Sequence, residues 1–68
     1  MKVGDLVMFT GTGIYGKWFY GKMGEIKKTT ISKNNGKLYC RVQWLHPVKY
    51  HDRFTSVSSF SSDNFKTT

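Results

Sequence analysis

Two lysines flank three consecutive aromatic rings in the short segment Lys17–Lys22, which reads Lys-Trp-Phe-Tyr-Gly-Lys. This segment has the chemistry to bind a single strand of nucleic acid, because ammonium groups neutralise phosphates while bases stack on exposed rings. A second interpretation fits the same residues: Trp18 and Tyr20 turn inward to cover a small core, and only Phe19 stays outside. The sequence supports both interpretations equally.

A second group of cations follows along the chain. Lys27, Lys28, Lys33 and Lys37 flank a predicted hairpin turn, and Arg41 lies in the strand after it. Strand alternation sends Lys27 and Lys28 to opposite faces unless a bulge intervenes. These cations would meet phosphates, or they would only protect the hairpin edge from pairing with other chains. The predicted nucleic-acid contacts from both groups are Lys17, Trp18, Tyr20, Lys22, Lys27, Lys28 and Arg41.

Metal binding or nucleophilic catalysis would have to use His46, His51, Asp52 and Cys40. Their spacing matches no zinc-ligand pattern, and Cys40 falls on the apolar face of a predicted strand, where a thiol behaves as a small hydrophobe. No cleft or set of oxyanion donors accompanies a Cys-His pair. We therefore expect no metal, no cofactor and no enzymatic activity.

The segment Tyr50–Arg53 is a further candidate surface, since it offers a ring and a cation and precedes the hydroxyl-rich residues 55–59. Two protein ligands are disfavoured. Basic proline-rich peptides need acidic residues in the first long loop, which here carries Lys17 and Lys22. A cationic surface also repels a methylated lysine.

The elements that position these residues belong to one small domain over residues 1–68, because so short a chain buries only about 60% of its unfolded surface. Two Trp, four Tyr and five Phe residues must supply much of the core. Eleven basic residues against four acidic ones give a net charge of +7, which attracts nucleic acid or an acidic protein surface.

One cysteine excludes an internal disulfide and favours the cytoplasm. The N-terminal residues carry no apolar signal core, and no run approaches the roughly 20 apolar residues that a membrane span needs. No membrane partner is expected.

Short strands are predicted throughout, since seven glycines interrupt every window of helical spacing. Residues 5–10 form the first strand, in which Val7 and Phe9 share one face. A long folded loop follows over residues 11–22. The second strand takes residues 23–32.

A bulge is expected near Lys28 and Thr29, because Ile26 and Ile31 would otherwise fall on opposite faces although both are apolar anchors. Asn34–Gly36 predicts a two-residue hairpin turn, because Asn-Gly tolerates positive φ. The third strand, residues 37–45, alternates strictly, and its apolar face carries Leu38, Cys40, Val42 and Trp44.

His46 and Pro47 end this strand, since proline has no backbone donor. A polar loop then leads to a fourth strand near residues 54–58. Ser61–Asp63 form one turn of 3₁₀ helix, and residues 64–67 form a short fifth strand. The fold class is therefore all-β, with a long first loop and a 3₁₀ turn before the last strand.

This order of elements resembles the five-stranded SH3-like small barrels, particularly their KOW and Tudor-like relatives. A Gly-Asp pair enters the first strand in these families, a G-x-x-G-x-I segment leads into the second, and a strand with Tyr and Trp forms the central wall. The resemblance covers nearly the whole chain, and the matching segments are Val3–Val7, Gly21–Ile26, Tyr39–Trp44 and Asp63–Phe65.

KOW relatives mostly bind RNA or ribosomal and transcription machinery, so the resemblance implies a nucleic-acid-binding or nucleoprotein-associated module without strong sequence specificity. Both RNA and single-stranded DNA are expected as partners. The ending Asn64-Phe65 is also similar to that of photosystem I subunit four, and stand-alone chains of this form resemble small accessory proteins of tailed bacteriophages. The alternative expectation is therefore a protein-interaction or assembly subunit of a larger complex, such as a phage particle.

Overall fold

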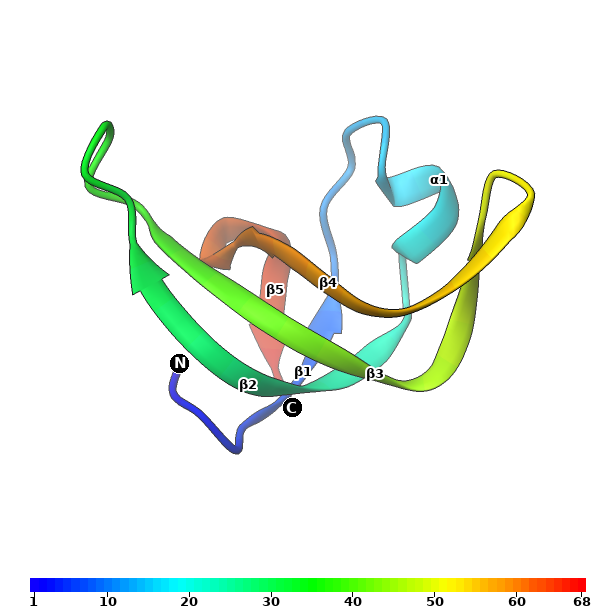
Figure 1. Cartoon of the computed structure of the whole chain (residues 1–68), viewed down its shortest axis with the longest axis horizontal. Helices are drawn as coiled ribbons and strands as arrows, with labels where there is room; N and C mark the ends of the chain where they lie inside the picture. Colours follow the sequence, from blue (N-terminus) through cyan, green and yellow to red (C-terminus); the bar gives the residue numbers. More distant parts are fainter.

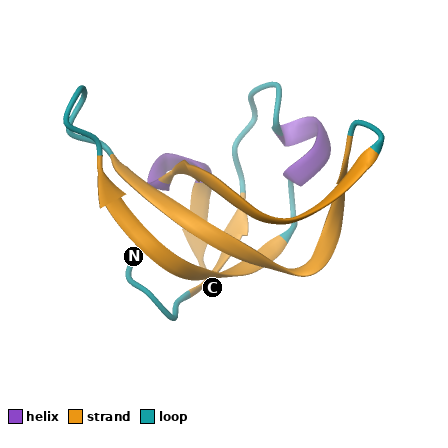
Figure 2. Cartoon of the chain, viewed as in Figure 1, coloured by secondary structure: helices purple, strands orange, loops and turns teal.

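Five antiparallel strands form one sheet in the computed structural model, which describes residues 1–68 (Figures 1 and 2). They are joined in part by two helical turns, and in chain order the elements are β1 (Leu6–Phe9), α1 (Gly16–Phe19), β2 (Met23–Ile31), β3 (Leu38–Tyr50), β4 (Arg53–Ser61), η1 (Ser62–Asn64) and β5 (Phe65–Thr67). The order across the sheet is β4-β3-β2-β1-β5, so β5 pairs with β1 while β4 and β5 are its open edges. The all-β class and the 3₁₀ turn before the last strand are confirmed, and the sheet is not closed into a barrel.

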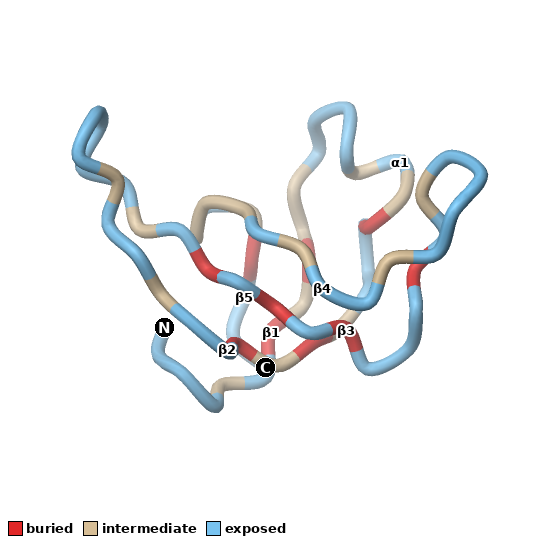
Figure 3. Tube along the Cα trace, viewed as in Figure 1, coloured by how far each residue is buried: buried red, intermediate tan, exposed pale blue.

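Nine buried apolar side chains form the core, and most of them lie on the strands (Figure 3). Val7 and Phe9 are buried on β1, as the alternation of the sequence predicts. The predicted apolar face of β3 is likewise confirmed at Cys40, Val42 and Trp44. Phe9 belongs to a ring cluster, in which four other ring centroids lie within 6.5 Å of its own: Phe19, Trp44, Phe60 and Phe65.

A bulge in β2 lies beside its predicted position. The register against β3 shifts between Ile26 and Lys28, which makes Lys27 the extra residue. Ile26 is fully buried, but Ile31 is 67% exposed because it lies beyond the end of the core. The predicted role of Ile31 as an apolar anchor is therefore wrong.

The connection between β2 and β3 is wider than the predicted two-residue turn. It takes residues 32–37, in which the Gly36 N–H donates to the Ser32 carbonyl oxygen at 2.9 Å. Gly36 adopts a φ of 68°, which its missing Cβ permits. The Asn35 side chain accepts the Lys37 N–H at 2.9 Å and completes the turn. The hairpin thus lies where the sequence predicts it.

The third strand does not end at the His46-Pro47 pair, as its sequence predicts, but continues to Tyr50. Its register against β4 shifts between Gln43 and Val48, so the proline falls in an irregular stretch that requires no donor from it. Pairing then resumes, and a tight turn in which His51 has a φ of 54° leads into β4. Most of the predicted polar loop is therefore strand, and β4 is longer than predicted.

The long loop between β1 and β2 contains one helical turn, α1, which the sequence does not predict. Phe19 on this turn is buried, Trp18 is half-buried and Tyr20 is 61% exposed. The interpretation that leaves only Phe19 outside is therefore wrong. No helix has the length and apolar character that crossing a membrane requires.

Gly24 gives the fold a sharp test, because it lies where β2 packs closely against β3. A Cβ at this position would overlap the Val42 side chain and lie 2.6 Å from the Gln43 carbonyl oxygen. We expect Gly24→Ala to lower the free energy of unfolding by roughly 1–3 kcal/mol in urea titrations, the usual cost of overpacking.

Gly13→Ala is the matched control, since nothing lies within 4 Å of a Cβ built there. We expect it to change stability by less than about 0.5 kcal/mol. Equal stability of the two variants would contradict the close packing of β2 on β3.

Candidate functional site

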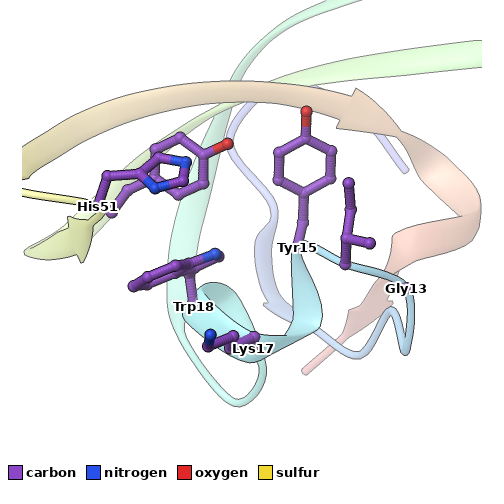
Figure 4. Close-up of a pocket in the computed structure, with 7 residues that line it drawn as sticks. Gly13, Tyr15, Lys17, Trp18 and His51 are labelled. Carbon is purple, nitrogen blue, oxygen red and sulfur yellow. The ribbon is translucent and has the colours of Figure 1, made fainter.

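A hollow of about 410 Å³ lies between the loop that carries α1 and the β3–β4 hairpin, two segments that meet at one end of the sheet (Figures 1 and 4). Rings and one cation dominate its lining. We call it the aromatic pocket, and its lining residues are Gly13, Ile14, Tyr15, Lys17, Trp18, Tyr50 and His51. It joins the lysine-aromatic segment to the candidate surface at Tyr50–Arg53.

Phe19 fixes α1 to the sheet and thereby positions the pocket. Its ring stacks on Trp44 with a centroid distance of 5.3 Å and an interplanar angle of 24°. Successive residues of a helical turn point about 100° apart, so burial of Phe19 leaves its neighbour Trp18 at the surface. Gly16 lets the loop close tightly, because a Cβ there would lie 2.5 Å from the Gly11 carbonyl oxygen.

The rings of the pocket come from two distant parts of the chain and contact one another. The Trp18 centroid lies 5.1 Å from that of His51 and 5.6 Å from that of Tyr50. Tyr15 approaches Tyr50 at 5.9 Å. Figure 4 shows the rings of Trp18 and His51 close together, with Tyr15 farther along the pocket. Each such ring pair contributes about 0.5–1.5 kcal/mol, so the hairpin and the loop hold each other in place.

Tyr50 lies at the junction of this network, in contact with rings on both sides. Partial burial raises the pKa of Tyr50, and the neighbouring Tyr15 phenol raises it further. The Tyr50 hydroxyl therefore stays protonated well into the alkaline range, as a neutral donor and acceptor at the wall of the pocket.

Lys17 supplies the positive charge of the pocket. Its Nζ lies 5.1 Å from the centroid of the Trp18 ring, within the range of a cation–π contact. The two ion pairs of the chain involve Lys27 and Lys37, so Lys17 has no acidic partner. The pocket can therefore offer a cation and aromatic faces to one ligand.

Two further hollows share Tyr50 with the pocket. One, of about 390 Å³, follows β4 past Thr55, Ser58 and Ser59 to Phe60, and we call it the serine hollow. The other, of about 470 Å³, lies at the hairpin between Tyr50 and Thr55. The hollowed surface therefore extends from the aromatic pocket along β4.

Lys28 and Arg41 lie apart from the pocket, on the outer face of the sheet. They are cross-strand partners, and Arg41 is also the partner of Ser59 on β4, so the three side chains share a face. The Lys27 ammonium lies 3.3 Å from a Glu25 carboxylate oxygen and is neutralised by it. Lys28 and Arg41 have no ion pair.

Tyr20 and Lys22 do not line the aromatic pocket. Tyr20 is exposed directly after α1, and Lys22 lines a separate hollow with Leu45 and Pro47. Of the predicted contacts, the structure thus brings only Lys17 and Trp18 together in the pocket. The other five lie outside it.

Five lining residues are missing from the predicted contacts: Gly13, Ile14, Tyr15, Tyr50 and His51. The sequence does mark Tyr50–Arg53 as a candidate surface, because a ring stands next to a cation there. It gives no indication that this hairpin packs against Trp18, since the contact joins residues far apart in the chain.

His, Cys, Asp and Glu side chains form no group of three or more that could hold a metal ion. Cys40 is fully buried, and burial raises the pKa of its thiol, which disfavours the nucleophilic thiolate.

No protein-family model, curated protein or solved structure matches the chain.

The raised pKa of Tyr50 predicts a specific loss of stability in alkali. The protonated phenol contributes fully below the unfolded pKa of about 10, and this contribution is lost as the pH rises through the higher folded pKa. As the pH rises from about 9 through about 10 and above, the free energy of unfolding should therefore fall more for the wild type than for Tyr50→Phe in urea titrations.

Tyr20→Phe, at an exposed ring, is the control and should lose as much stability as the wild type over this range. Equal losses in the wild type and Tyr50→Phe would show that the Tyr50 hydroxyl is not perturbed by the fold.

Proposed function

We propose that this chain is a non-catalytic SH3-like module that binds single-stranded RNA or DNA without strong sequence specificity. The aromatic pocket carries the proposal, because the Lys17 ammonium lies over the Trp18 ring at an open surface. A base stacked there would gain about 1–3 kcal/mol while its phosphate meets Lys17. A duplex suits the pocket less, since its base faces are already stacked.

The charge of the chain supports the same partner. Of eleven basic residues, only Lys27 and Lys37 form ion pairs with acidic side chains. Most of the positive charge therefore remains available to attract phosphates. The hollow at the hairpin is lined by Asp52 and also by Arg53, so a positive charge lies beside the negative one there.

The SH3-like part of the proposal is supported by the strand order β4-β3-β2-β1-β5 and by η1 before β5. In this arrangement the first loop and the β3–β4 hairpin supply the binding surface while the sheet acts as a rigid scaffold. A KOW-like module in particular would fit the positive net charge of the chain. The partner would be met in the cytoplasm, the compartment favoured by the single cysteine.

A protein partner is the alternative, with the chain serving as an interaction or assembly subunit of a larger complex such as a phage particle. Apolar side chains around the pocket favour this alternative, because Ile14 is 81% exposed and Phe54 is 71% exposed. Salt separates the two cases, since contact with a polyanion weakens steeply with salt and apolar contact does not.

Fluorescence anisotropy with labelled single strands and a duplex, at about 50 and 200 mM salt, tests the proposal. We expect single strands to bind at low salt and to bind less tightly at high salt. Lys17→Glu and Trp18→Ala should each weaken binding about tenfold or more, because one removes a phosphate contact and the other a stacked base. Circular dichroism establishes that both variants are folded.

Lys22→Glu and Tyr20→Ala are matched controls, since they make equivalent changes nearby but outside the pocket. They should keep most of the affinity. Equal losses in both sets of variants would argue against the pocket as the site. Absence of binding to every single strand at low salt would refute the proposal and favour a protein partner.

A further inference from the structure

A row of side chains leads from the serine hollow to the outer face of the sheet. Ser59, Arg41 and Lys28 are successive cross-strand partners on β4, β3 and β2. Neighbouring strands lie about 4.8 Å apart, so the row spans about 10 Å. Ser59 also lines the serine hollow, which shares Tyr15 and Tyr50 with the aromatic pocket. One residue of β4 thus belongs to both surfaces.

The pairing of Lys28 with Arg41 places two positive charges directly opposite each other. Like charges in this position destabilise a sheet. Glu25 neutralises Lys27 close by, but no acidic side chain forms an ion pair with Lys28 or Arg41. An anion bound between them would relieve the repulsion.

The edge strand β4 between the two surfaces allows close approach by a ligand. After Arg53 it carries no charged side chain, and four of its nine residues are serines. No strand pairs with its outer edge. Alternate backbone N–H groups of an edge strand point to solvent, where they can donate to phosphate oxygens together with the serine hydroxyls.

We propose that a single strand of nucleic acid runs from the aromatic pocket across β4 at Ser59 to Arg41 and Lys28. Bases stack in the pocket, and later phosphates of the same strand meet the two cations on the outer face. This path rests on the proposed function and adds a second set of contacts, which only a strand long enough to cross β4 can reach.

The path predicts that affinity depends on the length of the strand. We would compare labelled oligothymidylates of about 4 and about 12 nucleotides, within the range of site sizes of small single-strand-binding domains. The longer strand should bind more tightly and with a steeper dependence on salt. The double variant Lys28→Gln/Arg41→Gln should lower the slope of log affinity against log salt by about 1.4 for the longer strand and leave the shorter strand unchanged.

Lys33→Gln/Lys66→Gln is the control, because it removes the same net charge at the β2–β3 turn and on β5, away from the path. It should change neither strand's binding relative to the wild type. The path is wrong if this control lowers the affinity for the longer strand as much as Lys28→Gln/Arg41→Gln does, or if Lys28→Gln/Arg41→Gln has no effect. In either case the pocket can still be the site. If the wild type binds neither strand at low salt, the proposed function fails and the path with it.

Discussion

The stack of Phe19 on Trp44 is the contact on which the rest of the structure depends. The core has only nine buried side chains, so one ring from the first loop is a large part of it. Because Phe19 packs against the sheet, its burial ties the loop to the strands. Trp18 and Lys17 are thereby held at the surface in one arrangement, opposite the β3–β4 hairpin. The candidate binding surface is thus a by-product of how the core is completed.

Strand alternation could be predicted because one face of each strand has to be buried, as Val7 and Phe9 show. The bulge at Lys27 lies beside its predicted position, but that prediction relied on Ile31 as a second apolar anchor, and Ile31 is exposed. The end of β3 was not predictable, since a proline ordinarily stops a strand. Pro47 is tolerated because β3 pairs irregularly with β4 at this point. This irregular pairing depends on both strands, so the sequence of neither strand alone indicates it.

The candidate site was predictable only in part, because its components are brought together by long-range contacts. Positive charges and rings were visible in the sequence, but the direction of a ring depends on the local backbone, and the helical turn at Gly16–Phe19 reversed the expected orientation of Phe19. The ion pair between Lys27 and Glu25 is a local contact by contrast, because the two residues are only two positions apart on β2. The sequence identified the charged and aromatic side chains, and the fold added which of them contact one another.

The pairing of β1 with β5 has a consequence for the kinetics of folding. Phe9 is the partner of Phe65, so two members of the ring cluster are separated by almost the whole chain. Closing so long a loop costs entropy before any contact rewards it, and topologies of this kind fold slowly. During translation the hairpins can form early, but the hydrophobic cluster stays incomplete until Phe65 has left the ribosome. Protection of the nascent chain from aggregation must last until then.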